Sequence, residues 1–187
     1  MQLIRLEIQG FKSFARPLQL DFAPGLTAIV GPNGSGKSNI ADAIRWVLGE
    51  QSTKMLRGKE RTDVIFSGTQ ARPAARKARV TLVFSNETEG FPVEAPEVAI
   101  TRTLALTGES TYQLNGEPIL LADLHQLLAA ARLGTKSYTV ISQGMVDHYL
   151  TANPTARREL FDEATGIKAL QLKLARAEQK MASTRQY

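Results

Sequence analysis

Apolar and polar residues alternate in two stretches near the start of the chain, residues 4–8 and 18–22. Alternation with a period of two is typical of a strand that buries one face, so both stretches are predicted to be strands. A Pro-Gly pair at positions 24 and 25 predicts a turn, and residues 26–30 (LTAIV) then form a short, mostly apolar run. A run of this kind next to a turn predicts a buried strand.

The period changes in residues 37–49, where apolar side chains recur at steps of three and four. This spacing predicts a helix with one apolar face, and Gly49 predicts its C-terminal end. The apolar positions of this helix are Ile40, Ala43, Ile44, Val47 and Leu48.

Further strands are predicted at residues 80–84, 98–100 and 138–141, and a second helix at 120–131. The Asn-Gly pair at positions 115 and 116 predicts a tight hairpin. A strand–loop–helix unit combined with antiparallel strands indicates an α/β domain, with a mixed sheet that includes an antiparallel lobe.

The tail, residues 154–187, is predicted to be a long helix that is separate from the domain formed by residues 1–153. After Gly166, apolar residues recur at alternating steps of three and four, which is the seam of a coiled coil. An amphipathic helix packed on its own domain has the same pattern, but the seam persists to the last turn, so the start of a coiled coil is preferred. The seam positions are Ile167, Leu170, Leu174, Ala177, Met181 and Thr184.

The composition of the 187 residues is that of a globular protein, with 43% hydrophobic and 22% charged residues. The apolar runs are far shorter than the roughly 20 residues of a membrane span, and the first residues lack the pattern of a signal peptide. We therefore expect a cytoplasmic protein without a membrane partner. The absence of cysteine excludes disulfides and thiolate metal sites.

The formal net charge of +5 is unevenly distributed. Residues 54–79 hold eight basic and two acidic side chains. Such a stretch is either a solvated surface or a contact site for nucleic acid, and the charge pattern leaves both interpretations open.

Residues 31–38 (GPNGSGKS) match the pattern of a phosphate-binding P-loop. Glycines let backbone N–H groups turn toward a phosphate, and the following helix adds the positive end of its dipole. Lys37 is expected to reach the β- and γ-phosphate oxygens of ATP, and Ser38 to ligate Mg²⁺. An ordinary glycine-rich turn does not explain the Lys-Ser pair. The candidate nucleotide-binding residues are Pro32, Asn33, Gly34, Ser35, Gly36, Lys37, Ser38 and Asn39.

Five stretches together resemble the structural maintenance of chromosomes (SMC) proteins, the bacterial branch above all. They are GFKSF at 10–14, GPNGSGKSNIADAIRWVLGEQS at 31–52, LRG at 56–58 followed by DVIF at 63–66, SYTVISQG at 137–144 and RRELFDEATGI at 157–167. The wider class of ABC-type ATPases, which includes coiled-coil enzymes of double-strand-break repair, shares only the more general features.

The resemblance implies roles for five residues outside the P-loop. Gln143 would complete the Mg²⁺ shell and sense the γ-phosphate, while Lys12 and Ser13 would lie beside the phosphates. Arg57 would act as an arginine finger, and Asp63 would position its segment near the base. Without the resemblance, these residues would be interpreted as a surface amide, a polar hairpin tip and ordinary surface charges.

Three parts of an SMC-type active site are missing from the sequence: a Walker B aspartate, a catalytic glutamate and a Ser-Gly-Gly signature loop. The family carries them in its C-terminal segment. The resemblance thus implies the N-terminal half of an ABC-type ATPase head, which hydrolyses ATP only in a complete head dimer and is inactive alone. The implied partners are the C-terminal half of the head, a second SMC head, a kleisin subunit and double-stranded DNA, and the implied location is the nucleoid.

The candidate DNA contacts are Lys59, Arg61, Arg72, Arg76 and Lys77, because such side chains neutralise phosphates without sequence preference. Many relatives instead carry basic residues beside the position of Leu121, where this chain has Leu120 and Ala122. Two other functions stay open: a related repair ATPase, and a DNA-binding scaffold in which ATP is only a switch.

Overall fold

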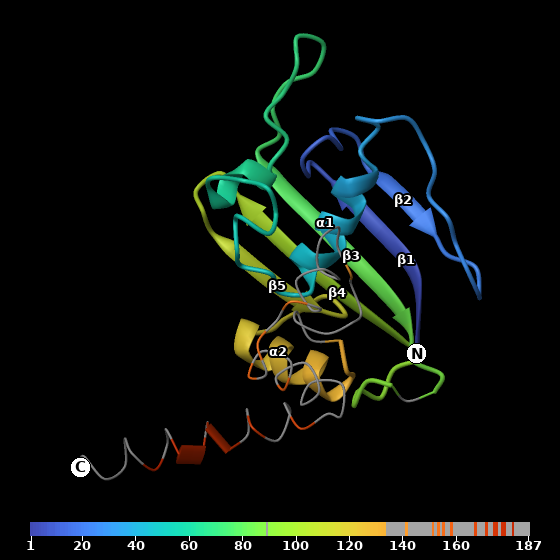
Figure 1. Ribbon diagram of the computed structural model, residues 1–187, viewed down its shortest axis with the longest axis vertical. Coiled ribbons are helices and arrows are strands. Elements are labelled where there is room, and N and C mark those ends of the chain that lie inside the picture. Colours follow the sequence, from blue (N-terminus) through green and yellow to red (C-terminus); the bar gives the residue numbers. More distant parts are fainter. Residues whose placement is uncertain are drawn as a thin grey trace. The chain divides into compact units, whose positions relative to one another are not determined.

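The computed structural model describes residues 1–133 except Glu89, together with single positions between 141 and 181 (Figure 1). The chain divides into two units, Met1–Leu124 and His125–Tyr187. The first unit carries the P-loop and nearly all of the described secondary structure, and the second begins within the last helix of the continuous part.

A six-stranded sheet forms the first unit, in the order β2-β1-β3-β4-β5-β6, and all of its strand pairs are antiparallel. The helix α1 lies across one face of this sheet and contacts β3 and β4 (Figure 1). The elements are β1 (Gln2–Gln9), β2 (Leu18–Asp21), α1 (Lys37–Val47), the 3-10 helix η1 (Arg61–Val64), β3 (Lys77–Ser85), β4 (Glu97–Ala105), β5 (Ser110–Leu114), β6 (Glu117–Pro118) and α2 (Leu121–Ala130). The predicted α/β class and antiparallel strands are confirmed.

The core lies between α1 and the sheet. In β1, Leu6 and Ile8 are buried and Ile4 on the same face is half-buried, in agreement with the period of two. Trp46 of α1 is 1% exposed and packs against the ring of Phe11, with 5.2 Å between the ring centroids. Burial of each such side chain contributes about 1.5–3 kcal/mol, so this layer fixes α1 against the sheet.

A buried arginine joins the end of α1 to the strands. Arg102 of β4 is 4% exposed, and its Nη1 donates hydrogen bonds of 2.8 Å to the carbonyl oxygens of both Trp46 and Glu50. Its guanidinium lies 4.6 Å from the Trp46 ring centroid and 5.0 Å from that of Tyr112. Burial lowers the pKa of Arg102 and raises the pKa of the Tyr112 phenol.

The hairpin predicted at positions 115 and 116 is present between β5 and β6. Asn115 has φ 49° and Gly116 has φ 90°, the two positive values that a type I′ turn requires. The Asn115 side chain also accepts a 2.7 Å hydrogen bond from the backbone N–H of Ala99, which ties the turn to the start of β4.

The buried strand expected at residues 26–30 is a wrong prediction for the described chain. This segment has no regular structure, and Leu26 and Val30 are 99% and 88% exposed. A strand exists only through pairing with a neighbour, and among the described residues none pairs with this segment.

The strand predicted at 138–141 falls outside the described residues, apart from Ile141. In the tail, the described positions Ile167, Leu174, Ala177 and Met181 are helical and exposed. The boundary between residues 153 and 154 stays a prediction.

Candidate nucleotide-binding site

The P-loop leads directly into the first turn of α1, as its sequence predicted. Gly36 precedes the helix with φ 96°, a left-handed conformation that strains residues with side chains. A Cβ atom at this position would also lie 3.0 Å from the Ser13 hydroxyl and 3.6 Å from the Phe14 ring. A side chain at position 36 would therefore strain the loop in this path.

The geometry of the loop suits a phosphate group. The N-terminus of α1 presents backbone N–H groups that the helix itself does not use, and its first turn carries no acidic residue. Lys37 bends back over the loop, where its Nζ donates hydrogen bonds of 2.6 and 2.7 Å to the carbonyl oxygens of Gly31 and Pro32. Ser38 is exposed beside it. A mobile ammonium, free backbone donors and a hydroxyl fit a nucleotide phosphate with its Mg²⁺ ion.

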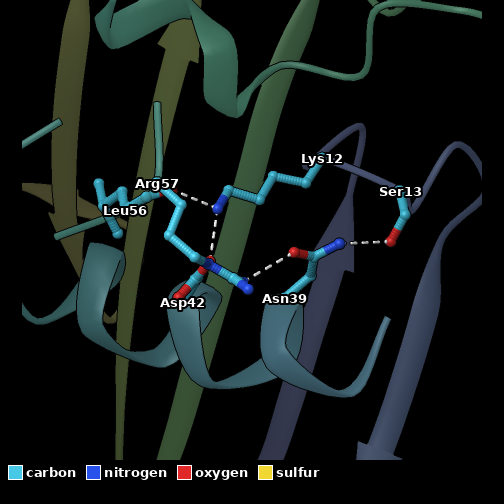
Figure 2. A network of polar contacts seen from close by, with 6 residues as sticks. All are labelled: Lys12, Ser13, Asn39, Asp42, Leu56 and Arg57. Atoms are coloured by element: carbon cyan, nitrogen blue, oxygen red, sulfur yellow. Dashed lines mark hydrogen bonds and ion pairs between the residues drawn. The ribbon is translucent and has the colours of Figure 1, made fainter. Parts of the chain in front are cut away.

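A network of polar contacts connects the P-loop helix to two other segments (Figure 2). Lys12 lies on the turn after β1, and its Nζ contacts the Asp42 carboxylate of α1 and donates a 2.5 Å hydrogen bond to the carbonyl oxygen of Leu56. Arg57 reaches the same carboxylate through Nη2 at 2.5 Å and Nε at 3.1 Å. The turn, the helix and the loop that carries Arg57 thus meet at one carboxylate.

Asn39 extends this network toward the nucleotide cradle. Its side-chain amide donates a 2.8 Å hydrogen bond to the Ser13 hydroxyl, and its Oδ1 accepts a 3.1 Å hydrogen bond from Arg57 Nη2 (Figure 2). Four residues that the sequence pointed to separately are therefore brought together in the structure: Lys12, Ser13, Asn39 and Arg57.

Asp42, which links these residues, was missed by the sequence interpretation. It is 4% exposed, a rare environment for a carboxylate unless it is paired. A signal was present in the sequence, because Asp42 stands directly beside Ala43 of the apolar helix face and three positions after Asn39. That spacing places Asn39 and Asp42 on the same side of α1.

Asp63 organises its own loop. Its carboxylate accepts hydrogen bonds from the backbone N–H groups of Lys59 at 2.7 Å and Glu60 at 2.9 Å, and these bonds lower its pKa. The carboxylate thereby caps η1 and shapes the chain between Arg57 and β3. Its expected position near the base of a nucleotide stays a prediction.

The basic residues proposed to contact DNA are exposed and fall into two groups. Arg61 begins η1 and Lys59 lies just before it, whereas Arg72 and Arg76 belong to the segment that leads into β3 and Lys77 is the first residue of β3. That segment includes a narrow loop that projects beyond the sheet (Figure 1) and is closed by a backbone hydrogen bond of 2.8 Å from Thr69 to Arg72.

Gln143, the second expected Mg²⁺ ligand, lies outside the described residues. In the described ranges, no three His, Cys, Asp or Glu side chains gather into a metal site. Within the same ranges, no helix has the length and apolar character needed to span a membrane.

A model of the RecF/RecN/SMC N-terminal domain matches residues 2–184 of the chain. The chromosome partition protein Smc of Rhodopirellula baltica is 47% identical over 176 residues, which is 94% of this chain and 15% of that relative. The chain therefore spans a small part of the length of its relatives.

Two solved structures have the same fold. One, from work on ATP-driven dimerization and DNA-stimulated activation of SMC ATPases, is 38% identical with a TM-score of 0.79, and the match covers 88% of this chain and 99% of that one. The other is an Smc head domain with an extended coiled coil bound to the C-terminal domain of ScpA, derived from Pyrococcus furiosus. It is 37% identical with a TM-score of 0.84, over 99% of this chain and 47% of that one.

Proposed function

Because the chain belongs to the RecF/RecN/SMC N-terminal domain family, we propose that residues 1–153 form the ATP-binding half of an SMC-type head and that residues 154–187 begin its coiled coil. The observation that carries this proposal is the P-loop at the start of α1. Lys37 and Ser38 lie there in the same helical turn as Asn39, which bonds to Ser13 and Arg57. The structure of SMC ATPases described for ATP-driven dimerization supports ATP as the nucleotide.

Each residue of the cradle has a separate task in nucleotide binding. Lys37 exchanges the Gly31 and Pro32 carbonyl oxygens for the β- and γ-phosphate oxygens, because a charged phosphate is the stronger acceptor for an ammonium group. Ser38 and Gln143 would hold Mg²⁺, which would neutralise charge on the phosphates when bound. Arg57 supplies a guanidinium to the same phosphates, and its planar fork matches their oxygens.

Hydrolysis requires groups from other segments. The C-terminal half of the head supplies the Walker B aspartate and the catalytic glutamate, and the signature loop of a second head covers the ATP. Nucleotide binding then joins two heads, and hydrolysis separates them during chromosome partition at the nucleoid. The Smc head bound to a ScpA domain supports a kleisin subunit as a further partner.

The exposed residues Lys59, Arg61, Arg72, Arg76 and Lys77 form the proposed DNA-contacting surface. They would bind duplex DNA through its phosphates, without sequence preference. The logarithm of the binding constant should then fall with the logarithm of salt concentration by about 0.9 for each phosphate neutralised. Charge reversal at Arg72 and Arg76 should reduce that slope, whereas an unchanged slope would exclude this surface.

The decisive experiment compares ATP hydrolysis by this chain alone, by the chain mixed with a separately produced C-terminal half, and by the mixture carrying Lys37→Ala. Only the wild-type mixture should turn over, and Lys37→Ala should weaken ATP binding at least about tenfold, since a charge-assisted contact to phosphate is lost. Lys54→Ala, which removes another exposed lysine, is the matched control. Mg²⁺-dependent turnover by the chain alone would contradict the half-site proposal.

A further inference from the structure

Asp42 is the most deeply buried charged group beside the P-loop. Its side chain is 6% exposed, against 12% for Lys12 and 53% for Arg57. A carboxylate in such a place requires a cation, because removal of its partner would leave a charge buried without compensation. Here two cations serve one carboxylate, and both contact the same oxygen, Oδ2.

The two cations are held unequally. Lys12 is anchored by its Leu56 contact and by a 2.7 Å hydrogen bond from its backbone N–H to the carbonyl oxygen of Val64. The backbone does not distinguish the two residues, because Lys12 (φ 47°) and Arg57 (φ 55°) both adopt a left-handed conformation. Their side chains differ in exposure: that of Lys12 is 12% exposed, whereas that of Arg57 is 53% exposed and therefore open to solvent and to a ligand. Lys12 is therefore the fixed partner of Asp42, and Arg57 is the partner that can leave.

The second cation, Lys12, lowers the free energy needed to move Arg57 away from Asp42. Two positive charges crowded on one oxygen repel each other, and Lys12 alone suffices to neutralise the carboxylate. If Lys12 were absent, movement of Arg57 would strand a buried negative charge. The Lys12 contact thus permits Arg57 to exchange Asp42 for another anion.

The position of Arg57 indicates which anion could replace Asp42 as its partner. Its Nη2 also donates to Asn39, which lies two residues after Lys37 in the first turn of α1 (Figure 2). We propose that Asp42 is a positioning residue that holds Arg57 beside the P-loop and releases it to a nucleotide phosphate, while Lys12 keeps the carboxylate neutralised. This inference rests on the proposed function.

The test is a double-mutant cycle in the full-length protein, with Asp42→Asn, Arg57→Ala and both together. Asp42→Asn should lower kcat about tenfold through misplacement of Arg57, with KM for ATP changed less than about twofold because the P-loop is intact. Added to Arg57→Ala, it should lower kcat no further. Asp21→Asn, which alters an exposed acid on β2, is the control and should leave kcat unchanged.

Each outcome has a separate meaning. Independent, multiplicative losses of kcat in the double variant would overturn the positioning role of Asp42 alone. Wild-type turnover of Arg57→Ala would overturn the proposed role of Arg57 and this inference with it, whereas failure of Lys37→Ala to weaken ATP binding would reject the nucleotide cradle itself.

A second variant keeps the inference testable if Asp42→Asn does not fold. Lys12→Met combined with Asp42→Leu replaces the buried ion pair by apolar groups, a change that proteins often tolerate. It should reproduce the loss of kcat and be insensitive to Arg57→Ala. Full turnover in this folded variant would contradict the inference.

Discussion

Arg102 and Arg57 both contact α1, but they differ in burial and in the kind of partner that holds them. Arg102 is 4% exposed and held by two carbonyl oxygens and two aromatic rings at the C-terminal end of α1. Arg57 is half exposed and held mainly by one carboxylate that already has another cation. Arg102, which is enclosed by neutral partners, therefore stabilises the fold. Arg57, which shares the Asp42 carboxylate with Lys12, can instead move to contact a ligand.

The largest effect is expected for Arg102→Ala. The substitution removes the hydrogen bonds that Arg102 donates to the carbonyl oxygens of Trp46 and Glu50 and opens a cavity between two rings. It should therefore lower the free energy of unfolding by about 3 kcal/mol. Urea denaturation of the assembled head measures the loss. Arg79→Ala, which removes an exposed arginine of β3, should change the value by less than about 0.5 kcal/mol. Equal effects of the two substitutions would contradict a structural role for Arg102.

A smaller effect is expected for Tyr112→Phe, which keeps the ring over Arg102 but removes the 2.9 Å hydrogen bond from Gln51 to the phenol oxygen. The loss should be about 1 kcal/mol at neutral pH.

The same substitution tests the pH dependence. Burial raises the pKa of Tyr112 above its ordinary value of 10.0, so the neutral phenol stabilises the folded state fully below pH 10.0. That contribution is lost as the pH rises toward the pKa of the folded protein. Unfolding measured between pH 8 and 11 should show a shallower decline for Tyr112→Phe than for the wild type, and parallel curves would refute the assignment.

The smallest effect on stability is expected for Arg57→Ala. Lys12 still neutralises Asp42, and an ion pair whose arginine is half exposed contributes little to stability. The free energy of unfolding should therefore change by no more than about 1 kcal/mol. Turnover of the complete head should nevertheless fall at least about tenfold. Arg16→Ala, another exposed arginine, should change neither quantity. A large loss of stability in Arg57→Ala would show that Arg57, like Arg102, has a structural role, and would contradict the difference between the two arginines.

Local patterns were sufficient for the regular elements. The period of two in β1 and the steps of three and four in α1 indicate which residues face the core. The Asn-Gly turn follows from the backbone preferences of its two residues. The same reasoning failed for residues 26–30, because an apolar run identifies a strand only when a neighbour is present to pair with it. The site was predicted in part: the P-loop from its motif, and Lys12, Ser13 and Arg57 from the resemblance, but Asp42 from neither.

The sequence by itself determined the antiparallel strands, the P-loop helix and the family, since each depends on residues that lie close together or recur in a fixed order. Only the tertiary structure decided the partners of charged groups. The strand pattern around Arg102 does not show that this arginine is buried. Its burial depends on contact with Trp46, which lies 56 residues away in the sequence. Asp42 is surrounded by residues from three segments, and the interaction between charges depends on distance in space and on exclusion of water, which no local pattern records.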